Sequence, residues 1–356
     1  MVAVLGLGAV FLALRAEGDD SGLPLEGLSS ASGVTRQAAI QQLAGLGAGR
    51  MGDLLYELGA DHAPLVRSGL AEAAGLMGVT TSEVSTLGVL TRHQDPDVRF
   101  QAARLLTAVA GSAFTPLRAM AVSEDEIVSV RAGAVRALGS AGAQARGTLR
   151  TLVQDDDTPG EVRRAALVAL ARVSIVGADD VAAFATDASN ALGERKVAVR
   201  ALGHASVLSD QQLVHLTAAS ETWVRAEAVT ALTAKSGTAQ IGVVANLTTD
   251  KAGEVRHAAL DALLRLGGLG SHTTWVTGRL NDSDPRVQVL AARACGGLTS
   301  PPTGLTTTLT GLLLSPNFRV RYEAALALLA LGNGAGKATM LTDSASANAS
   351  HAALAL

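Results

Sequence analysis

The stretch DPDVRFQAARLL, residues 95–106, contains the pattern that decides the fold of this chain. It opens with a polar turn, Asp95 to Asp97, and continues with apolar residues at Val98, Ala102, Leu105 and Leu106. Offsets of 0, 4, 7 and 8 fall on one face of a helix with 3.6 residues per turn. The stretch therefore predicts a turn followed by an amphipathic helix.

The same pattern recurs ten times at intervals of 30 to 33 residues. Its first position falls at Thr35, Val66, Val98, Val130, Val162, Glu194, Val224, Val255, Val287 and Val320. Ala predominates four residues later, where a neighbouring helix is expected to approach closely. Leu predominates eight residues later, where a larger gap must be filled. A second, less regular apolar helix precedes each copy, for example around residues 87–90 and 149–153. Because one hairpin cannot bury its apolar face alone, the copies are expected to stack into a continuous core.

These spacings predict an all-α chain. The expected architecture is a right-handed α-α superhelix of about ten helical hairpins over residues 34–356, with residues 349–356 forming a degenerate half-repeat at the C-terminus. Aromatic residues make up only 3% of the chain, and Ala, Leu and Val supply most of its apolar content, which suits closely packed helices.

Residues 34–332 resemble the HEAT-repeat family, in particular the short bacterial repeats similar to phycobilin-lyase subunits. The resemblance rests on the Asp-Pro-Asp-Val98-Arg99 turn, the following Ala102 and Leu106, and the interval of about 32 residues. It implies a solenoid whose second helices line a concave surface. Members of this family include scaffolds, transport adaptors, chromophore lyases, a di-iron hydroxylase and DNA glycosylases, so the resemblance specifies the fold far better than the function.

The N-terminus is expected to differ from the rest of the chain. Residues 2–14 are all apolar or glycine, and residues 17–33 are rich in Gly, Ser and acids. Thirteen helical residues reach about 20 Å, short of the bilayer core of roughly 30 Å. Two interpretations of residues 1–16 remain open: an export signal or membrane anchor, which would place the array outside the cytoplasmic membrane, or an apolar helix packed on the domain. Residues 17–33 are predicted to be a flexible linker.

The position after the first of each copy is arginine in nine of ten repeats, with Gln288 as the exception. We expect these arginines to pair with carboxylates or carbonyls of the adjacent turns and so to hold the stack together. They are Arg36, Arg67, Arg99, Arg131, Arg163, Arg195, Arg225, Arg256 and Arg321.

A second group of cations is predicted to face away from the core. Offsets 2, 3, 6 and 10 point outward on the second helices, and in the four central copies they hold no acid. We expect this basic ridge to receive an acidic partner segment, with Phe100 as an apolar contact; the alternative is that the cations only solvate an Ala-rich face. The ridge comprises Phe100, Arg104, Arg136, Arg164, Arg172, Lys196 and Arg200.

No catalytic constellation, cofactor motif or metal-ligand spacing stands out. The seven histidines are scattered over different repeats, and the single cysteine, Cys295, occupies a core column. A net charge of −3 disfavours general nucleic-acid binding. The sequence therefore predicts a non-enzymatic scaffold or adaptor with a protein partner. A lyase-like protein handling a small anionic ligand, and a nucleic-acid-binding solenoid, remain as alternatives.

Overall fold

The computed structural model describes residues 22–205, 210–266, 273–338 and 340. The described residues form helices joined by short turns and contain no strand. The chain divides into two compact units, Met1–Phe184 with Ala205–Val207 and Ala185–His204 with Leu208–Leu356. The prediction of an all-α chain of repeated helical hairpins is thereby confirmed.

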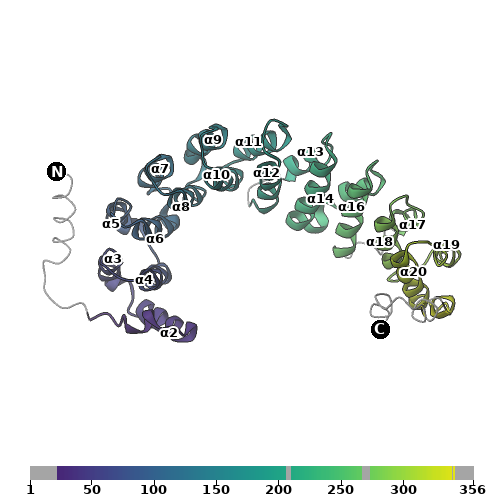
Figure 1. The fold of residues 1–356 in the computed structure, drawn as a ribbon, viewed down its shortest axis with the longest axis horizontal. Helices are drawn as coiled ribbons and strands as arrows, with labels where there is room; N and C mark the ends of the chain where they lie inside the picture. Colours follow the sequence, from purple (N-terminus) through teal and green to yellow (C-terminus); the bar gives the residue numbers. More distant parts are fainter. Residues whose placement is uncertain (1–21, 206–209, 267–272, 339, 341–356) are drawn as a thin grey trace. The chain divides into compact units, whose positions relative to one another are not determined.

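In the first unit, the helices alternate between two layers (Figure 1). The second helices of the hairpins, α4, α6, α8 and α10, lie side by side in one layer after α2, and α3, α5, α7 and α9 lie in the other. The helices of this part are α2 (Gly33–Ala44), α3 (Met51–Leu58), α4 (Pro64–Met77), α5 (Val84–Leu90), α6 (Pro96–Leu106), α7 (Phe114–Val122), α8 (Val128–Leu138), α9 (Arg146–Gln154), α10 (Gly160–Val173) and α11 (Ile175–Thr186).

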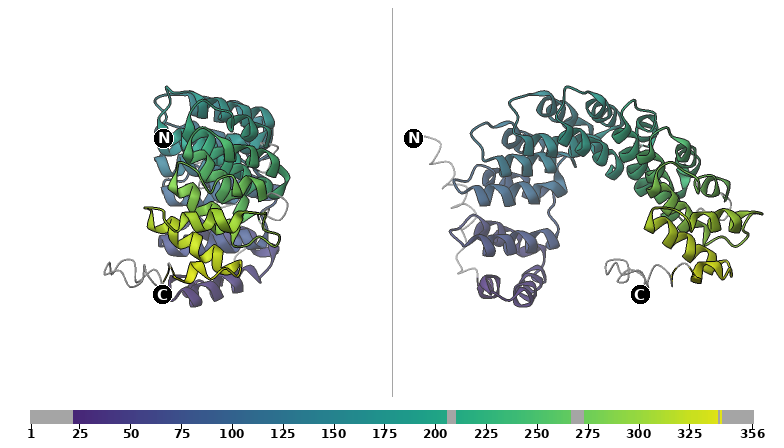
Figure 2. Two further views of the ribbon diagram at one scale, coloured as in Figure 1. Left: turned by 90° about the vertical axis from the view of Figure 1, so that its right-hand side faces the viewer. Right: turned by 45° about the vertical axis from the view of Figure 1, so that its right-hand side comes forward.

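The second unit repeats this alternation, which can be followed by colour in the right-hand view of Figure 2. Here α12, α14, α16, α18 and α20 pack in succession as the second helices. Its helices are α12 (Leu192–His204), α13 (Asp210–Leu216), α14 (Thr222–Ser236), α15 (Ile241–Asn246), α16 (Gly253–Arg265), α17 (Thr273–Thr277), α18 (Pro285–Cys295), α19 (Leu305–Leu312) and α20 (Phe318–Ala330).

The polar turns start the second helices by capping them. The side chain of Asp95 accepts a hydrogen bond from the Asp97 amide at 2.8 Å, and Pro96 occupies the first turn of α6. Asp284 caps α18 in the same way, with its carboxylate 2.9 Å from the Arg286 amide. These caps satisfy amides that would otherwise lack a partner at a helix start, and proline loses nothing there.

Small residues let successive second helices approach closely. A Cβ added to Gly139 would lie 3.1 Å from Cβ of Ala169, and one added to Gly203 would lie 2.7 Å from Cβ of Ala231. Both glycines stand nine residues after the start of their copy, and both alanines stand seven after the start of the next. The recurrence shows that neighbouring second helices run parallel and in register, with each contact made by equivalent positions.

The N-terminal end of the described chain packs on the first hairpins. The short 3-10 helix Glu26–Ser29 contacts α2 and α4, and Leu28 is fully buried. Gly69 of α4 makes room for Leu28, because a Cβ there would lie 2.7 Å from a Leu28 methyl carbon. Residues 26–29 therefore cover the end of the core, which differs from the flexible linker predicted over residues 17–33. The apolar segment of residues 1–16 and the degenerate half-repeat of residues 349–356 lie outside the described residues.

Candidate partner-binding face

Four arginines of the predicted ridge lie exposed on the second helices of the first unit. Arg104 projects from α6, Arg136 from α8, and Arg164 and Arg172 from α10. Arg104 donates a hydrogen bond from Nη1 to Oε1 of Gln101 at 3.3 Å. Within the described part of the chain, no carboxylate lies within ion-pair distance of any of the four. Their positive charges are therefore open to solvent or to a partner.

Phe100 occupies a half-buried position between α6 and α8. Two of its ring carbons lie 3.0 Å from where a Cβ on Gly133 would stand, so the ring covers the backbone of the next repeat. Gln101, expected to point outward beside it, is 5% exposed. The prediction that offset 3 faces away from the core is wrong at Gln101 and at Ala165, which are both buried. At Gly133, which has the same offset, the ring of Phe100 from the preceding second helix covers the position.

Arg104 also borders a groove between α4 and α6. The groove has a volume of about 360 Å³, and Glu72, Leu76, Val79 and Leu105 are among the residues that line it. Glu72 holds in α4 the same repeat position that Arg104 holds in α6. The row of exposed cations therefore begins at Arg104 and is bounded on its N-terminal side by a carboxylate.

The two predicted ridge residues of the second unit have partners of their own. Arg200 of α12 forms an ion pair between its Nε and Oε1 of Glu227 in α14. The ammonium of Lys196 lies 5.9 Å from the centre of the Trp223 ring, a cation–π arrangement. Farther along, Arg293 of α18 pairs with Glu323 of α20 at 2.5 Å.

One repeat position decides whether a ridge arginine is paired. Arg104, Arg136, Arg200 and Arg293 all stand six residues after the start of their copy. The carboxylates of Glu227 and Glu323 stand three residues after the start of the following copy, and there they reach the arginine of the preceding helix. In the first unit that position holds Gly133 after Arg104 and Ala165 after Arg136. The column of sixth positions is visible in the sequence, but the pairing became apparent only from the helix contacts.

The arginine column forms a separate network at the turns. Arg99 donates through Nη1 to the carbonyls of His93 and Gln94 at 2.7 and 2.9 Å, and through Nε and Nη2 to Glu126, both at 2.6 Å. Arg225 repeats this geometry, with both distances to the Asp250 carboxylate at 2.9 Å. Each such arginine joins its own turn to the turn of the next repeat.

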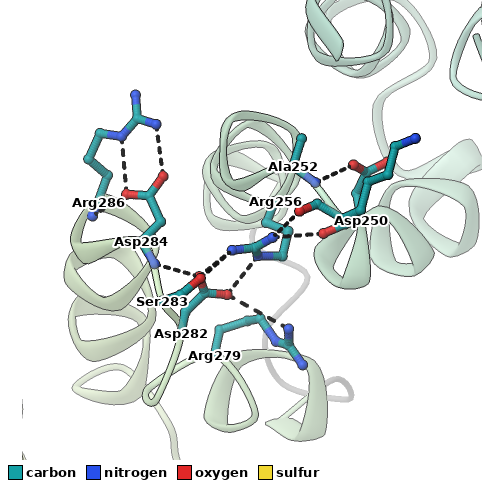
Figure 3. Close-up of polar contacts among 9 residues, drawn as sticks. Asp250, Ala252, Arg256, Arg279, Asp282, Ser283, Asp284 and Arg286 are labelled. Carbon is teal, nitrogen blue, oxygen red and sulfur yellow. Dashed lines mark hydrogen bonds and ion pairs between the residues drawn. The ribbon is translucent and has the colours of Figure 1, made fainter. Parts of the chain in front are cut away.

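Arg256 shows the most complete set of these contacts (Figure 3). Its Nε and Nη2 donate to the two oxygens of Asp282 at 2.7 and 2.5 Å, and its Nη1 donates to the carbonyls of Asp250 and Lys251. The Asp282 side chain is 2% exposed. Burial there disfavours its charged form, but hydrogen bonds from Arg256 and the Asp284 amide outweigh it and hold the pKa of Asp282 below its usual value.

The remaining arginines of the column have a smaller set of contacts. Arg67 pairs with Asp95 at 2.6 Å, and Arg195 pairs with Glu221 while donating to the Ala185 carbonyl. Turn carbonyls accept hydrogen bonds from Arg36, Arg163 and Arg321. Arg131 is buried and donates to the Ala121 carbonyl at 3.3 Å. How much these contacts stabilise the stack stays a prediction.

The described residues offer little for catalysis. Burial raises the pKa of the Cys295 thiol to about 12, so the thiolate needed for nucleophilic attack is scarce at neutral pH. No group of three His, Cys, Asp or Glu side chains in the described ranges is arranged to hold a metal ion. Across those same ranges, no helix combines the length and apolar composition needed to cross a bilayer.

Residues 84–171 and 273–356 match the family described as HEAT repeats. The chain is a HEAT-repeat protein. This match covers the hairpins from α5 to α10 and the C-terminal ones, in agreement with the repeat interval in the sequence. A comparison with curated protein sequences gives no significant match.

A solved structure, that of importin beta, supports the same fold. An importin beta structure is 14% identical, with a TM-score of 0.50, and the match covers 93% of this chain and 54% of that one. Kap121p is 13% identical over 94% of this chain and 49% of its own, with a TM-score of 0.39. The Escherichia coli protein YibA is 17% identical over 88% and 91% of the two chains, with a TM-score of 0.30. The HEAT-repeat chain spans about half the length of these karyopherins. At 14% identity, the likeness to importin beta concerns the fold alone.

Proposed function

We propose that this HEAT-repeat protein is a non-enzymatic scaffold that binds an acidic segment of a partner protein on the second helices of its first unit. The observation that carries the proposal is the set of exposed arginines, Arg104, Arg136, Arg164 and Arg172, without a carboxylate partner in the described chain. HEAT-repeat solenoids typically serve as protein-interaction scaffolds, and the solved Kap121p structures include complexes with Pho4p and Nup53p.

Charge favours an acidic partner over other ligands. A guanidinium binds a carboxylate through two parallel hydrogen bonds, and an exposed one is hydrated less strongly than an ammonium. The whole chain carries a net charge of −3, so this basic face contrasts with its surroundings and orients an incoming acidic segment. The same net charge argues against a long polyanion such as nucleic acid.

The scarcity of reactive groups among the described residues supports a binding role. The only cysteine is buried with a raised thiol pKa, and the arginine column is engaged in contacts between turns. A groove of about 570 Å³ between α5 and α7 is lined by small and apolar residues such as Gly88, Val89, Ala119 and Met120, together with Arg92 and Glu126. The Glu126 carboxylate is already engaged by hydrogen bonds from Arg99.

The test is affinity capture from a lysate of the source organism with the full chain and with the double variant Arg104→Glu, Arg136→Glu. We expect a protein rich in acidic segments to be captured by the wild-type chain and lost with the variant. Capture should also weaken between low and physiological salt, because exposed charges are screened over about 8 Å at 0.15 M ionic strength.

A matched control carries the same change of net charge on the opposite layer. Arg118 of α7 is exposed and Arg92 follows α5, so Arg92→Glu, Arg118→Glu alters charge without touching the second helices. Equal loss of capture with both double variants would contradict the proposal, since the effect would then follow net charge alone. Circular dichroism should show that both variants keep their helical content.

A further inference from the structure

We infer that the binding face of the first unit reads an extended peptide in which two acidic residues are spaced three apart and an apolar residue stands directly before the first. The inference rests on the proposed function and specifies the partner. It follows from the register of α6 and α8, from the groove beside Arg104, and from the carboxylate of Glu72.

The spacing of the acids comes from the spacing of the helices. Phe100 at offset 2 of α6 covers Gly133 at offset 3 of α8, so the two helices run parallel and in register. Arg104 and Arg136, both at offset 6, are therefore neighbours in one row across the layer. Packed helices lie about 10 Å apart, and an extended chain advances about 10 Å in three residues. Acidic residues at positions n and n+3 therefore match the two arginines.

Glu72 fixes the register of the bound peptide. It stands at offset 6 of α4, in the same row as Arg104 and Arg136 and one helix before them. A peptide shifted by one repeat toward the N-terminus would place an acid opposite Glu72, and this repulsion disfavours the shifted arrangement. On the other side, Val168 occupies offset 6 of α10, with Arg164 and Arg172 before and after it along the helix.

The groove between α4 and α6 supplies the apolar subsite. Its lining by Leu76, Val79, Leu105 and Ala108 suits an apolar side chain, and its volume of about 360 Å³ leaves ample room for one. Arg104 lines the same groove, so the apolar residue and the acid that binds Arg104 are neighbours in the peptide. In a peptide that runs from α6 towards α8, the apolar residue stands directly before that acid. Glu72 on the facing wall disfavours a second acid in that place.

The test uses fluorescence anisotropy with the full chain and three labelled peptides of equal length and net charge at low ionic strength. The first contains Leu-Glu followed by a second Glu three positions after the first, within Ser and Ala. The second has the same composition with the two Glu adjacent. The third replaces Leu by Ser. We expect the first peptide to bind about fivefold more tightly than either of the others, the scale of one exposed ion pair or one small apolar contact.

Reversing the charge of Glu72 tests whether the face can gain binding of a third acidic residue. Glu72→Arg adds a third cation to the row, and it should favour a peptide with three Glu at intervals of three over one with two by about fivefold. Glu72→Gln serves as the matched control and should give a smaller preference. Gln37 contacts Glu72 only at 3.5 Å, so the fold does not depend on this carboxylate.

The outcomes separate the two proposals. Equal binding of the spaced and adjacent peptides, both abolished by Arg104→Glu, Arg136→Glu, would overturn the spacing while leaving an acidic partner in place. Binding of all three peptides that the double variant does not weaken, or no binding of any, would overturn the proposed function together with this inference. Preference for the spaced peptide that disappears in the double variant supports both.

Discussion

Arg136 in α8 and Arg200 in α12 occupy the same position of their repeats but have different surroundings. Arg200 is paired with Glu227 of the following second helix. The position equivalent to Glu227 after Arg136 is Ala165, and Arg136 has no ion pair within the described residues. Arg293 with Glu323 repeats the paired arrangement in the second unit. A single residue of the following repeat therefore decides whether a ridge arginine stabilises the stack or remains free to bind.

Both units contain the arginine column, but its arginines differ in how many hydrogen bonds they donate to the turns. In the second unit, Arg225 and Arg256 each bind a carboxylate through two nitrogens and two turn carbonyls through a third. In the first unit, Arg99 has this full set, whereas Arg131 donates to one carbonyl. The comparison suggests that repeat units joined by the same motif differ in how strongly each turn is tied to the next.

The largest effect is expected from breaking the Arg256 network. Asp282→Ala leaves a buried guanidinium without its carboxylate, and removing one partner of a buried pair costs about 3 kcal/mol or more of unfolding free energy. Denaturant unfolding should show a lower midpoint, and hydrogen exchange should localise the faster amides to α16 and α18. Asp156→Ala, at an exposed turn of the first unit, should leave both measurements unchanged. An equal loss of stability in Asp156→Ala would show that the buried Arg256–Asp282 pair contributes no more than an exposed carboxylate.

A smaller loss of unfolding free energy is expected from a substitution where two second helices are in close contact. Gly203→Ala places a Cβ 2.7 Å from Cβ and 3.0 Å from Cα of Ala231, so α12 and α14 must separate. Overpacking of this kind costs about 1–3 kcal/mol. Gly147→Ala in α9, where nothing lies within 4 Å, should instead stabilise by roughly 0.5–1 kcal/mol. Thermal unfolding in which both variants shift in the same direction would contradict the close approach.

Single substitutions should give Arg136 an ion-pair partner and take the partner of Arg200 away. Ala165→Glu supplies Arg136 with the carboxylate that Glu227 gives Arg200, and it should weaken binding of an acidic peptide about fivefold. Glu227→Ala should free Arg200 and create weak acidic-peptide binding in the second unit. Titration of the two variants checks both directions, and Ala165→Gln controls for the added bulk. Unchanged affinity in Ala165→Glu would show that Arg136 does not contact the peptide.

The smallest effect is expected between neutral pH and about pH 4. The pKa values of Asp95, Asp250 and Asp282 are lowered: burial opposes this shift, but hydrogen bonds from arginines and backbone amides outweigh it. Their contribution to stability is fully present above the unfolded pKa of about 3.9 and is lost as pH falls through the lower folded values. Unfolding midpoints should therefore stay nearly flat down to about pH 4 and then fall. Asp282→Asn should flatten that fall; an unchanged acid limb would indicate that other groups cause it.

Much of the fold was predictable because the apolar residues that pack in the core recur at the same positions of each repeat. The starts of the second helices, the buried Ala and Leu columns and the buried Cys295 follow from offsets on one helical face. The outward side was predicted less well. Offset 3 was predicted to be exposed, yet Gln101 and Ala165 are buried. At Gly133 the side chain of Phe100 from the neighbouring helix covers this offset, which periodicity within one helix cannot reveal.

The sequence by itself determined that the chain is a stack of helical hairpins, where the second helix of each hairpin begins, and which columns of Ala, Leu and Val form the core. These properties depend on short-range periodicity and on turn residues, which are local along the chain. Only the tertiary structure decided which arginines are neutralised and which remain available. An ion pair between Arg200 and Glu227 joins residues 27 positions apart, and its formation depends on the distance and register between two packed helices, which no single segment encodes.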